Sequence, residues 1–305
     1  MPAITLSLQA RPTDAAEWLA LCRRAEDLGL DAIYAAHHLG STASPFVALA
    51  AAAAVTSRVR LGTYVVNAGI AEPLALASDV ATLDVVSGGR AVLGVGAGHT
   101  PAEWTMLGRV QPSPRERVDR MIAVADATRR LLAGELVTAD GLADARLDAP
   151  RPVQDPIPLL IGGNGTRVLR HAARHADIVG VSGLGRTLPD GHSHEVAWRP
   201  YQIEERVELV RKTAAAAGRA PQLEALVQHV ELTDDAEAAA QRVAADVPGV
   251  NADDLLAAPY TLFGTPEEIA AELRRHAERL GITRFVVRAD ALDAAAAILG
   301  IAAVP

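Results

Sequence analysis

Short runs of apolar and β-branched residues alternate along the chain with longer segments of helical periodicity. Each short run predicts a strand, because its length and composition suit a buried strand. One following segment predicts a helix with Thr265 as its cap, Pro266 in its first turn and Gly281 at its end. Another helix is expected to open at Thr13 and to stop at Gly29. The predicted strands are residues 4–8, 32–35, 60–66, 91–97, 157–161, 178–181, 226–232 and 284–288.

The number of strand and helix pairs separates two α/β architectures. Eight pairs fit a closed (β/α)8 barrel, or TIM barrel, better than an open doubly wound sheet, which usually has about five or six strands. We therefore expect a single barrel domain over residues 1–305. Two stretches exceed ordinary loops: an insertion at about residues 182–201 after the sixth strand, and a smaller excursion at 134–156 after the fourth helix. Loops of this length are more often functional than idle.

The charge pattern narrows the choice of partner. The chain has 29 lysines and arginines against 37 aspartates and glutamates, mixed along its length, and its net charge is -8. This balance argues against nucleic acid and against a basic membrane-binding patch, and it favours a small-molecule substrate. The single cysteine, Cys22, excludes a disulfide within the chain and a thiolate zinc site. Because the sequence shows neither an apolar membrane span nor a secretory leader, we expect a cytoplasmic protein.

Polar residues follow several predicted strands at the point where each strand ends. His37 and His38 follow the second strand, Asn67 the third, and Gly98 and His99 the fourth. The active site of a (β/α)8 barrel lies at this end of the strands. If the second strand continued to the histidine pair, only one of the two side chains could face the barrel mouth. Histidines at neighbouring strand ends favour proton chemistry about as strongly as a structural role.

Alternate glycines mark the fourth strand, in "LGVGAGH". Gly94, Gly96 and Gly98 fall on one strand face, where missing side chains admit either a bulky neighbour or a flat ligand. This run alone does not decide between them.

A second glycine-rich stretch, "IGGNGT", joins the fifth strand to a helix. Backbone N–H groups at such a helix start suit a phosphate group. The alternative is an ordinary tight turn capped by Thr166. The candidate phosphate-binding residues are Gly162, Gly163, Gly165 and Thr166.

The remaining histidines and two tryptophans carry weaker signals. His171 and His175 lie four residues apart on a predicted helix, where a solvated helical face is favoured over a metal site. In the insertion, "HSH" at 192–194 favours substrate contact over metal ligation, so no metal is expected. Tryptophans near the fourth and sixth strand ends either wall a pocket or pack under a loop. The tentative substrate contacts are Trp104, His194 and Trp198.

Three blocks of the sequence resemble the bacterial luciferase-like superfamily, and more closely its branch that uses the deazaflavin coenzyme F-420 (8-hydroxy-5-deazaflavin). The first block is "RLGTYVVNAGIAEPLALASDVATLDVVSGGRAVLGVGAGH", residues 60–99. "PIPLLIGG" and "LFGTPEEIAAELRRHAERLGI" follow in the same order as in the family. Together the blocks span nearly the whole chain.

This resemblance implies a (β/α)8 barrel with a flat cofactor ring near a bulge after the third strand and cofactor phosphate near the fifth strand end. It also implies a non-proline cis peptide near Tyr64 and Val65, and proton transfer by His38 together with His99. A homodimer is implied by the resemblance alone. The positions expected to touch the cofactor are His37, Tyr64, Val65, Asn67, Ala97, Gly98, Gly162, Gly163, Gly165 and Thr166.

Two departures from relatives shape the expected reaction. His37 stands where many relatives have aspartate, and His99 stands where sugar-phosphate dehydrogenases of the branch have glutamate. Imidazoles in place of carboxylates fit a reductase better than a glucose-6-phosphate dehydrogenase. The alternatives are an FMN-dependent monooxygenase of the same superfamily and a flavin-binding barrel without catalysis. We expect a flavin or deazaflavin reductase system to supply reduced cofactor.

Overall fold

The computed structural model describes residues 3–139, 141–188 and 194–302. The chain forms two compact units. The N-terminal unit is Ala10–Gly162, and the C-terminal unit combines Met1–Gln9 with Gly163–Pro305.

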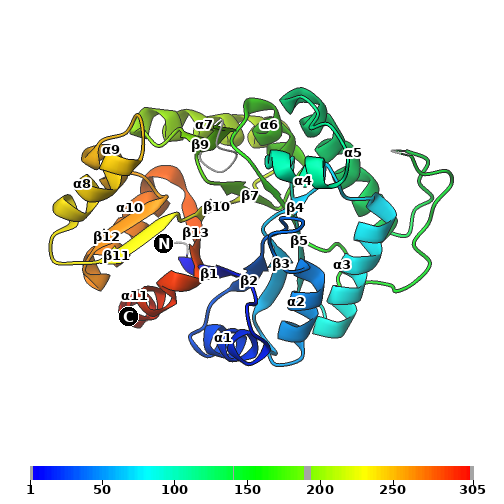
Figure 1. Ribbon diagram of the computed structural model, residues 1–305, viewed down its shortest axis with the longest axis horizontal. Coiled ribbons are helices and arrows are strands. Elements are labelled where there is room, and N and C mark those ends of the chain that lie inside the picture. The colour runs from blue at the N-terminus through cyan, green and yellow to red at the C-terminus, as the bar shows by residue number, and fades with distance from the viewer. Residues whose placement is uncertain (1–2, 140, 189–193, 303–305) are drawn as a thin grey trace. The chain divides into compact units, whose positions relative to one another are not determined.

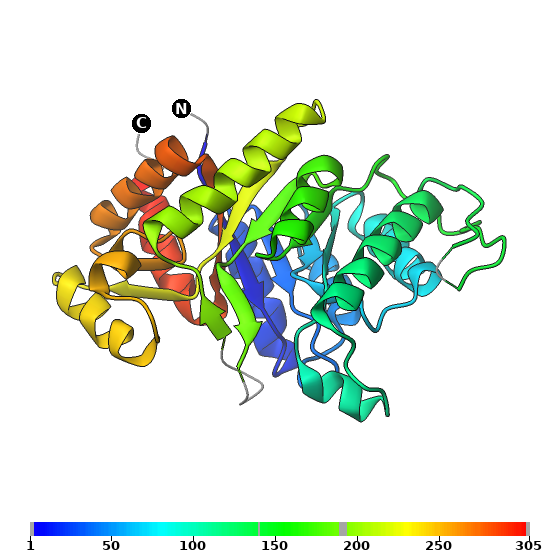
Figure 2. The same ribbon diagram turned by 90° about the horizontal axis from the view of Figure 1, so that it is seen from above.

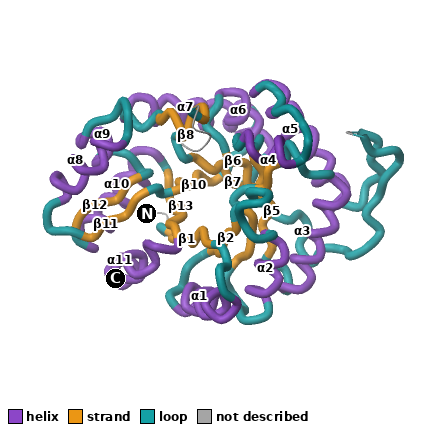
Figure 3. Tube along the Cα trace, viewed as in Figure 1, coloured by secondary structure: helices purple, strands orange, loops and turns teal. Residues whose placement is uncertain are grey.

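The N-terminal unit is a parallel sheet with helices between its strands, as Figure 3 shows. Strand β3 pairs with both β2 and β5, and β5 pairs in turn with β4 and β6. Its strands are β2 (Ala32–Ala35), β3 (Arg60–Thr63), β4 (Val66–Asn67), β5 (Ala91–Gly96) and β6 (Leu159–Gly162). Its helices are α1 (Ala15–Asp27), α2 (Pro45–Ala53), α3 (Pro73–Ser87), α4 (Pro101–Met106) and α5 (Pro114–Leu132).

The C-terminal unit is built on a second set of parallel strands, in which β13 pairs with β1 and β10, and β10 pairs with β7. These strands are β1 (Thr5–Ala10), β7 (Ile178–Val181), β10 (Gln222–Leu226) and β13 (Ile282–Arg288). A hairpin of β8 (Leu184–Thr187) and β9 (His194–Val196), and a parallel pair of β11 (His229–Leu232) and β12 (Thr261–Gly264), complete the strands. The helices are α6 (Thr166–His175), α7 (Pro200–Ala216), α8 (Ala236–Asp246), α9 (Ala252–Leu256), α10 (Pro266–Leu280) and α11 (Leu292–Ala302).

Four parallel barrel strands in each unit, joined through helices, make the chain a (β/α)8 barrel, as predicted (Figure 1). In this count β3 and β4 form one strand, interrupted at residues 64–65. Helix α10 begins and ends as expected, because Thr265 accepts a bond from the Glu268 N–H and Gly281 adopts a left-handed φ of 64°. Helix α1 begins one residue later than predicted: Asp14, not Thr13, accepts bonds from the first-turn N–H groups.

The predicted strand at residues 226–232 is wrong. Barrel strand β10 ends at Leu226, and β11 pairs with β12 instead of with the barrel. The change of partner is visible in the backbone, because the Val227 N–H still donates to Val286 O on β13 whereas the Gln228 N–H donates to Tyr260 O. One alternating run serves both strands, so the pattern does not show where the partner changes.

Both long connections expected from the sequence are present. The excursion after α5 is tied down by a bridge between Val137 and Ala145 and by a small apolar core against α3 and α5. The insertion after β7 contains the β8–β9 hairpin, which Figure 2 shows as two short green strands. Within the described part of the chain, no helix is both long and apolar enough to cross a membrane.

Candidate active site

The alternate glycines in β5 and directly after it, Gly94, Gly96 and Gly98, make room for the neighbouring strand. A side chain at any of them would collide with residues 63–67, so the bulky-neighbour explanation of the sequence pattern holds. An added Cβ at Gly94, Gly96 and Gly98 would lie 1.9 Å from Thr63 O, 2.6 Å from Val65 Cγ2 and 1.9 Å from Asn67 Oδ1, respectively. The glycines therefore allow β3, β4 and the residues between them to approach β5 closely.

The break between β3 and β4 is the expected cis peptide. The Tyr64–Val65 bond is cis without a proline, as the resemblance implies. Tyr64 is buried, and its ring lies 5.1 Å from that of Tyr34. The Val65 side chain is half-buried and also reaches Gly162, where an added Cβ would lie 3.1 Å from Val65 Cγ1. This arrangement brings the third strand end against β5 and the end of β6.

A buried carboxylate joins two of the predicted site residues. Glu103, on α4, accepts a hydrogen bond from Asn67 Nδ2 through Oε2 at 2.5 Å, and its Oε1 lies 2.7 Å from His38 Nδ1. The Asn67 amide is oriented by the Gly69 N–H, which donates to Oδ1 at 3.0 Å. The side chain of Glu103 is 2% exposed, whereas that of His38 is 35% exposed. The imidazole therefore has one nitrogen on a buried carboxylate and an accessible opposite side.

His99 lies beside His38. Their ring centroids are 5.4 Å apart in an edge-to-face arrangement. Thr100 Oγ1 lies between the two rings, 3.4 Å from His38 Nδ1 and 3.5 Å from His99 Nδ1. Gln111 Nε2 donates to the His99 carbonyl at 3.0 Å and anchors this loop. The two histidines predicted to handle protons thus come together from the loops after β2 and β5, the two strands that flank β3.

His37, the other member of the adjacent pair, is half-buried. Strand β2 ends at Ala35, so strand alternation does not decide where either histidine points. Burial lowers the pKa of His37, the charge of Glu103 opposes this, and nearby His38 lowers the pKa further. Its Nδ1 is buried without a hydrogen-bond partner among the described residues. A neutral imidazole with a free nitrogen at this position can still bond to a ligand.

Glu103 stays charged despite its burial. Desolvation by itself raises the pKa of a carboxyl group, but the hydrogen bonds from His38 and Asn67 and the charges of His38 and His37 outweigh it. The pKa of Glu103 therefore lies below its usual value. Sequence reasoning missed this residue. The one available signal was its position four residues after His99 in a predicted helix.

The glycine-rich turn after β6 presents backbone rather than side chains. Gly165 is the N-cap of α6 and Thr166 is its first residue, so the alternative in which Thr166 caps the helix does not hold. No side chain caps this helix start. The Gly163 N–H donates to Gly180 O at 3.1 Å, and the Leu169 N–H donates to Gly165 O at 3.0 Å. Anion binding at this turn would depend on the N–H groups of residues 166–168.

Trp104 follows Glu103 on α4, and its ring packs against Gly69. It is 4% exposed, and an added Cβ at Gly69 would lie 2.6 Å from its ring. Its Nε1 is buried without a hydrogen-bond partner among the described residues.

Ala97 is half-buried directly after β5, between the closely packed Gly96 and Gly98.

Trp198 and His194 belong to the insertion in the C-terminal unit. Trp198 is buried, donates from Nε1 to Ser182 O at 2.9 Å and packs against Tyr260. His194 opens β9, with Nδ1 3.3 Å from Gly185 O. His192 lies outside the described residues. Trp198 thus supports the insertion, and His194 is the more accessible of the two proposed substrate contacts.

The histidine pair of α6 is only in part the solvated face that was expected, because His175 is exposed whereas His171 is not. The rings of His171 and His175 stack with centroids 4.5 Å apart, and His171 is buried. Among the described residues, no cluster of three or more histidine, cysteine, aspartate or glutamate side chains could hold a metal ion. Cys22 is buried, and burial raises the pKa of its thiol to about 12 although the charge of Arg23 opposes this.

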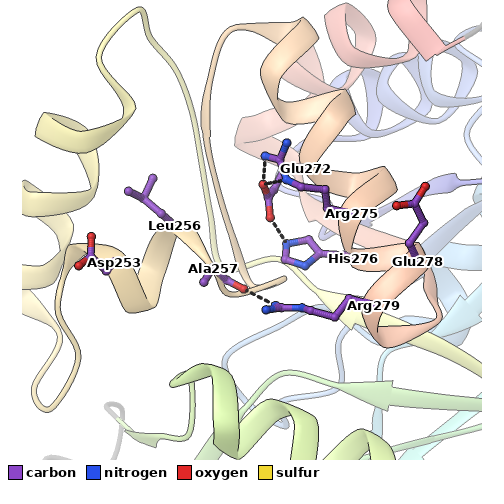
Figure 4. A pocket seen from close by; sticks show the side chains of 8 residues that line it. All are labelled: Asp253, Leu256, Ala257, Glu272, Arg275, His276, Glu278 and Arg279. Atoms are coloured by element: carbon purple, nitrogen blue, oxygen red, sulfur yellow. Dashed lines mark hydrogen bonds and ion pairs between the residues drawn. The ribbon is translucent and has the colours of Figure 1, made fainter.

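A pocket of about 680 Å³ lies on α9 and α10, and none of the predicted site residues line it (Figure 4). One of its lining residues is the buried His276, whose Nε2 lies 3.3 Å from Glu272 Oε1. Arg279 on the same helix donates to Ala257 O at 3.0 Å. The lining residues are Asp253, Leu256, Ala257, Glu272, Arg275, His276, Glu278 and Arg279.

The fold and the His38 cluster define a (β/α)8-barrel enzyme with histidines and a buried carboxylate at the carboxyl ends of its strands. The sequence profile of the luciferase-like monooxygenase family matches residues 3–249. The chain belongs to this family and is one of its oxidoreductases.

Two relatives illustrate the sequence similarity. An uncharacterized protein of Mycobacterium tuberculosis is 36% identical over 241 residues, which are 76% of this chain and 77% of that protein. An F-420-dependent glucose-6-phosphate dehydrogenase of Kineococcus radiotolerans is 35% identical over 178 residues, 54% of this chain and 52% of the dehydrogenase. The chain therefore matches about half of the dehydrogenase.

Solved structures agree on the fold. The F-420-dependent tetrahydromethanopterin reductase of Methanopyrus kandleri has a TM-score of 0.76 at 22% identity, with 97% of both chains covered. A monooxygenase of Streptomyces bottropensis has a TM-score of 0.74 at 26% identity, also with 97% of both chains covered. The shared fold is thus found both in an F-420-dependent enzyme and in a monooxygenase.

Proposed function

We propose that this chain uses coenzyme F-420 for hydride transfer to or from a small organic substrate, with His38 as the residue that transfers the proton. The observation that carries the proposal is the His38 imidazole, held on a buried carboxylate and accessible on its other side. Relatives named F-420-dependent dehydrogenases support the choice of cofactor. His99, 5.4 Å away, is the second proton-handling residue of the proposal.

Two features of the chain fit a phosphate-bearing, flavin-like cofactor. The first is the buried Nδ1 of His37, which has no protein partner among the described residues. The second is the start of α6, which no side chain caps. In the proposal, Tyr64, Val65, Asn67, Ala97 and Gly98 face the ring, and Gly162, Gly163, Gly165 and Thr166 hold the phosphate. When bound, the deazaflavin supplies or accepts the hydride.

The protein's own contribution is proton transfer and orientation. In the reductive direction, His38 gives a proton from Nε2 while Nδ1 stays on Glu103. Proton transfer by a positioned side chain typically contributes about 10²–10⁴-fold to a rate. We propose the reductive direction because His37 and His99 replace residues that are carboxylates in many relatives. An imidazolium can donate a proton where an ionised carboxylate can only accept one.

Cofactor titration tests the proposal. Purified protein is titrated with F-420 and, separately, with FMN, and binding is followed by fluorescence under air and under nitrogen. We expect saturable binding of F-420 and oxygen-independent turnover with reduced F-420 and an unsaturated or carbonyl acceptor. Binding of FMN alone would contradict the proposal. Binding of F-420 with no turnover on any acceptor would instead support a non-catalytic binding barrel.

An FMN-dependent monooxygenase is the second candidate. It is favoured by the family description and by the 26% identity with a monooxygenase over 97% of both chains. Substrate-dependent oxygen consumption with FMN and a reductase distinguishes it, because a deazaflavin enzyme transfers a hydride without activating oxygen.

We also propose a homodimer and a separate reductase system that regenerates reduced cofactor. Sedimentation of the pure protein tests the first. Turnover that stops after one equivalent of reduced cofactor, and resumes when a regenerating enzyme is added, tests the second.

A further inference from the structure

Glu103 connects three segments of the N-terminal unit that are distant in sequence. It lies on α4, beside the end of β4 (Figure 1). One oxygen meets His38 from the loop after β2, 65 residues away, and the other accepts from Asn67 at the end of β4. Both contacts are short, and the carboxylate is almost fully buried. A buried charge is stable only where such partners compensate it, so the contacts with His38 and Asn67 are needed to keep Glu103 charged in the interior.

The chemistry of a carboxylate fixes the proton on the imidazole. Glu103 is ionised and can only accept hydrogen bonds, so Nδ1 of His38 carries a hydrogen and donates it. The Asn67 amide cannot reverse, because Gly69 N–H donates to its Oδ1 while its Nδ2 donates to Glu103. The oxygen that faces Asn67 is therefore occupied. The remaining oxygen is directed at His38, whose Nε2 is left for the substrate.

We propose that Glu103 is a positioning residue: it fixes His38 with Nδ1 protonated and stabilises the imidazolium form that gives a proton from Nε2. The inference rests on the proposed role of His38. In the reductive direction the substrate gains a hydride from the reduced deazaflavin and a proton from Nε2, and the ring returns to its neutral Nδ1–H form. Solvent can return the proton, since the His38 side chain is 35% exposed. A buried acceptor on one ring nitrogen orients the other in the same way as in the Ser-His-Asp triad.

A purely structural role makes a different prediction. If Glu103 only holds α4 against β4 through Asn67, then glutamine, which is nearly isosteric, should lower stability without changing the state of His38. If it positions His38, the loss of the negative charge should alter both the imidazole and the reaction. His37 and His99 also lie near His38, and neither is a carboxylate that could take the place of Glu103.

The test compares Glu103→Gln, Glu103→Asp and the wild type, as full-length proteins. Nitrogen NMR of labelled histidine reads the His38 ring directly, assigned by its loss in His38→Ala. We expect the wild type to show the Nδ1–H tautomer. In Glu103→Gln the amide can donate to Nδ1, so the Nε2–H tautomer should appear. The kcat should fall about 10²-fold while the dissociation constant of F-420 changes less than about threefold. Glu103→Asp, which keeps the charge, should recover part of kcat.

Glu26→Gln is the matched control. Glu26 is another largely buried glutamate of the same unit, but it accepts from the N–H groups of Ser57, Arg58 and Val59. Its loss should lower stability and leave both the His38 tautomer and kcat unchanged.

The possible failures are distinguishable. An unchanged His38 tautomer and an unchanged kcat in Glu103→Gln overturn the inference. So does a fall in stability equal to that of Glu26→Gln with the His38 signals unaltered, because it shows a structural role. If wild-type protein neither binds nor turns over F-420, the proposed function fails. The NMR comparison still decides whether Glu103 sets the tautomer of His38.

Discussion

Two histidine–glutamate pairs of this chain, His38 with Glu103 and His276 with Glu272, are built in opposite ways. In the N-terminal unit the carboxylate of Glu103 is 2% exposed and the His38 side chain is 35% exposed. On α10 the His276 side chain is 1% exposed and that of Glu272 is 22% exposed. His38 lies 2.7 Å from its glutamate, whereas neither nitrogen of His276 has a hydrogen bond among the described residues.

The charges around the two rings differ as well. Burial, together with the charges of Arg279 and Arg275, lowers the pKa of His276 to about 4. Glu272 is engaged by Arg275, which donates to it from Nε at 2.7 Å. His276 is therefore neutral at pH 7, although a carboxylate oxygen lies 3.3 Å away. Proximity to a glutamate does not by itself make a proton donor: the carboxylate must be committed to the histidine, and the histidine must be accessible.

The largest expected effect comes from removing the accessible imidazole. His38→Ala should lower kcat by about 10²–10⁴-fold, because proton transfer acts in the transition state. The dissociation constant of F-420 should change less than about threefold, since the same group contributes little to ground-state binding. Steady-state turnover and fluorescence titration measure the two quantities. A variant with unchanged kcat would remove His38 as the acid.

Acidification should lower the stability of the protein through the other histidine, His276, which is buried. The pKa of His276 is about 4 in the folded state against 6.5 for a free side chain. Below pH 6.5 the unfolded chain takes up a proton that the folded chain does not, so stability falls as the pH falls from 6.5 toward 4. The loss over this window is about 3 kcal/mol. Denaturant unfolding at several pH values measures it.

His276→Leu is the reference for this pH series. The variant has no proton to take up at position 276, so it should lose about 3 kcal/mol less than the wild type between pH 7 and pH 4. His37, whose pKa is also lowered, contributes in the same direction in both proteins and cancels in the comparison. Parallel curves for the two proteins would show that His276 is not the titrating group.

The contrast between the pairs also marks what the sequence could predict. The barrel and the histidines at strand ends follow from patterns along the chain, and the cis peptide at Tyr64–Val65 follows from the family resemblance. The contact between Glu103 and His38 does not, because it joins residues 65 positions apart and depends on how α4 leaves β5. The sequence reads "AEW" at this point, and a glutamate in a short helix ordinarily faces solvent.

The glycines at positions 94, 96 and 98 are a second case in which the sequence could not decide between two structures. The sequence left open whether a ligand or a bulky neighbour fills their missing side chains. The alternative could be decided only by how β3 and β4 pack on β5, which brings residues 63, 65 and 67 against Gly94, Gly96 and Gly98. Register is fixed by packing of the whole sheet and is not written in one strand.

A side chain at Gly98 should disturb the contact between His38 and Glu103 indirectly, by displacing Asn67. An added Cβ would lie 1.9 Å from Asn67 Oδ1, and the residue has a φ of +72°. Gly98→Ala should therefore displace the Asn67 amide from Glu103 and destabilise the fold by about 2 kcal/mol. Gly108→Ala is the control, because Gly108 has a φ of +67° with nothing within 4 Å. It should lose only about 1 kcal/mol and retain activity. Equal losses in both variants would show that Asn67 tolerates the side chain.

The smallest expected effect is that of His276→Leu at pH 7. Leucine fills a similar volume, and it removes two buried ring nitrogens that have no hydrogen-bond partner among the described residues. Replacing an unsatisfied buried polar group by an apolar one is close to neutral or stabilising, so unfolding free energy should change by less than about 1 kcal/mol. Because His276 is uncharged at this pH and lies in a different unit from His38, kcat and F-420 affinity should equal those of the wild type. A large fall in kcat with normal stability would mean that the buried pair also acts on the reaction, and accessibility would then no longer separate the two histidines.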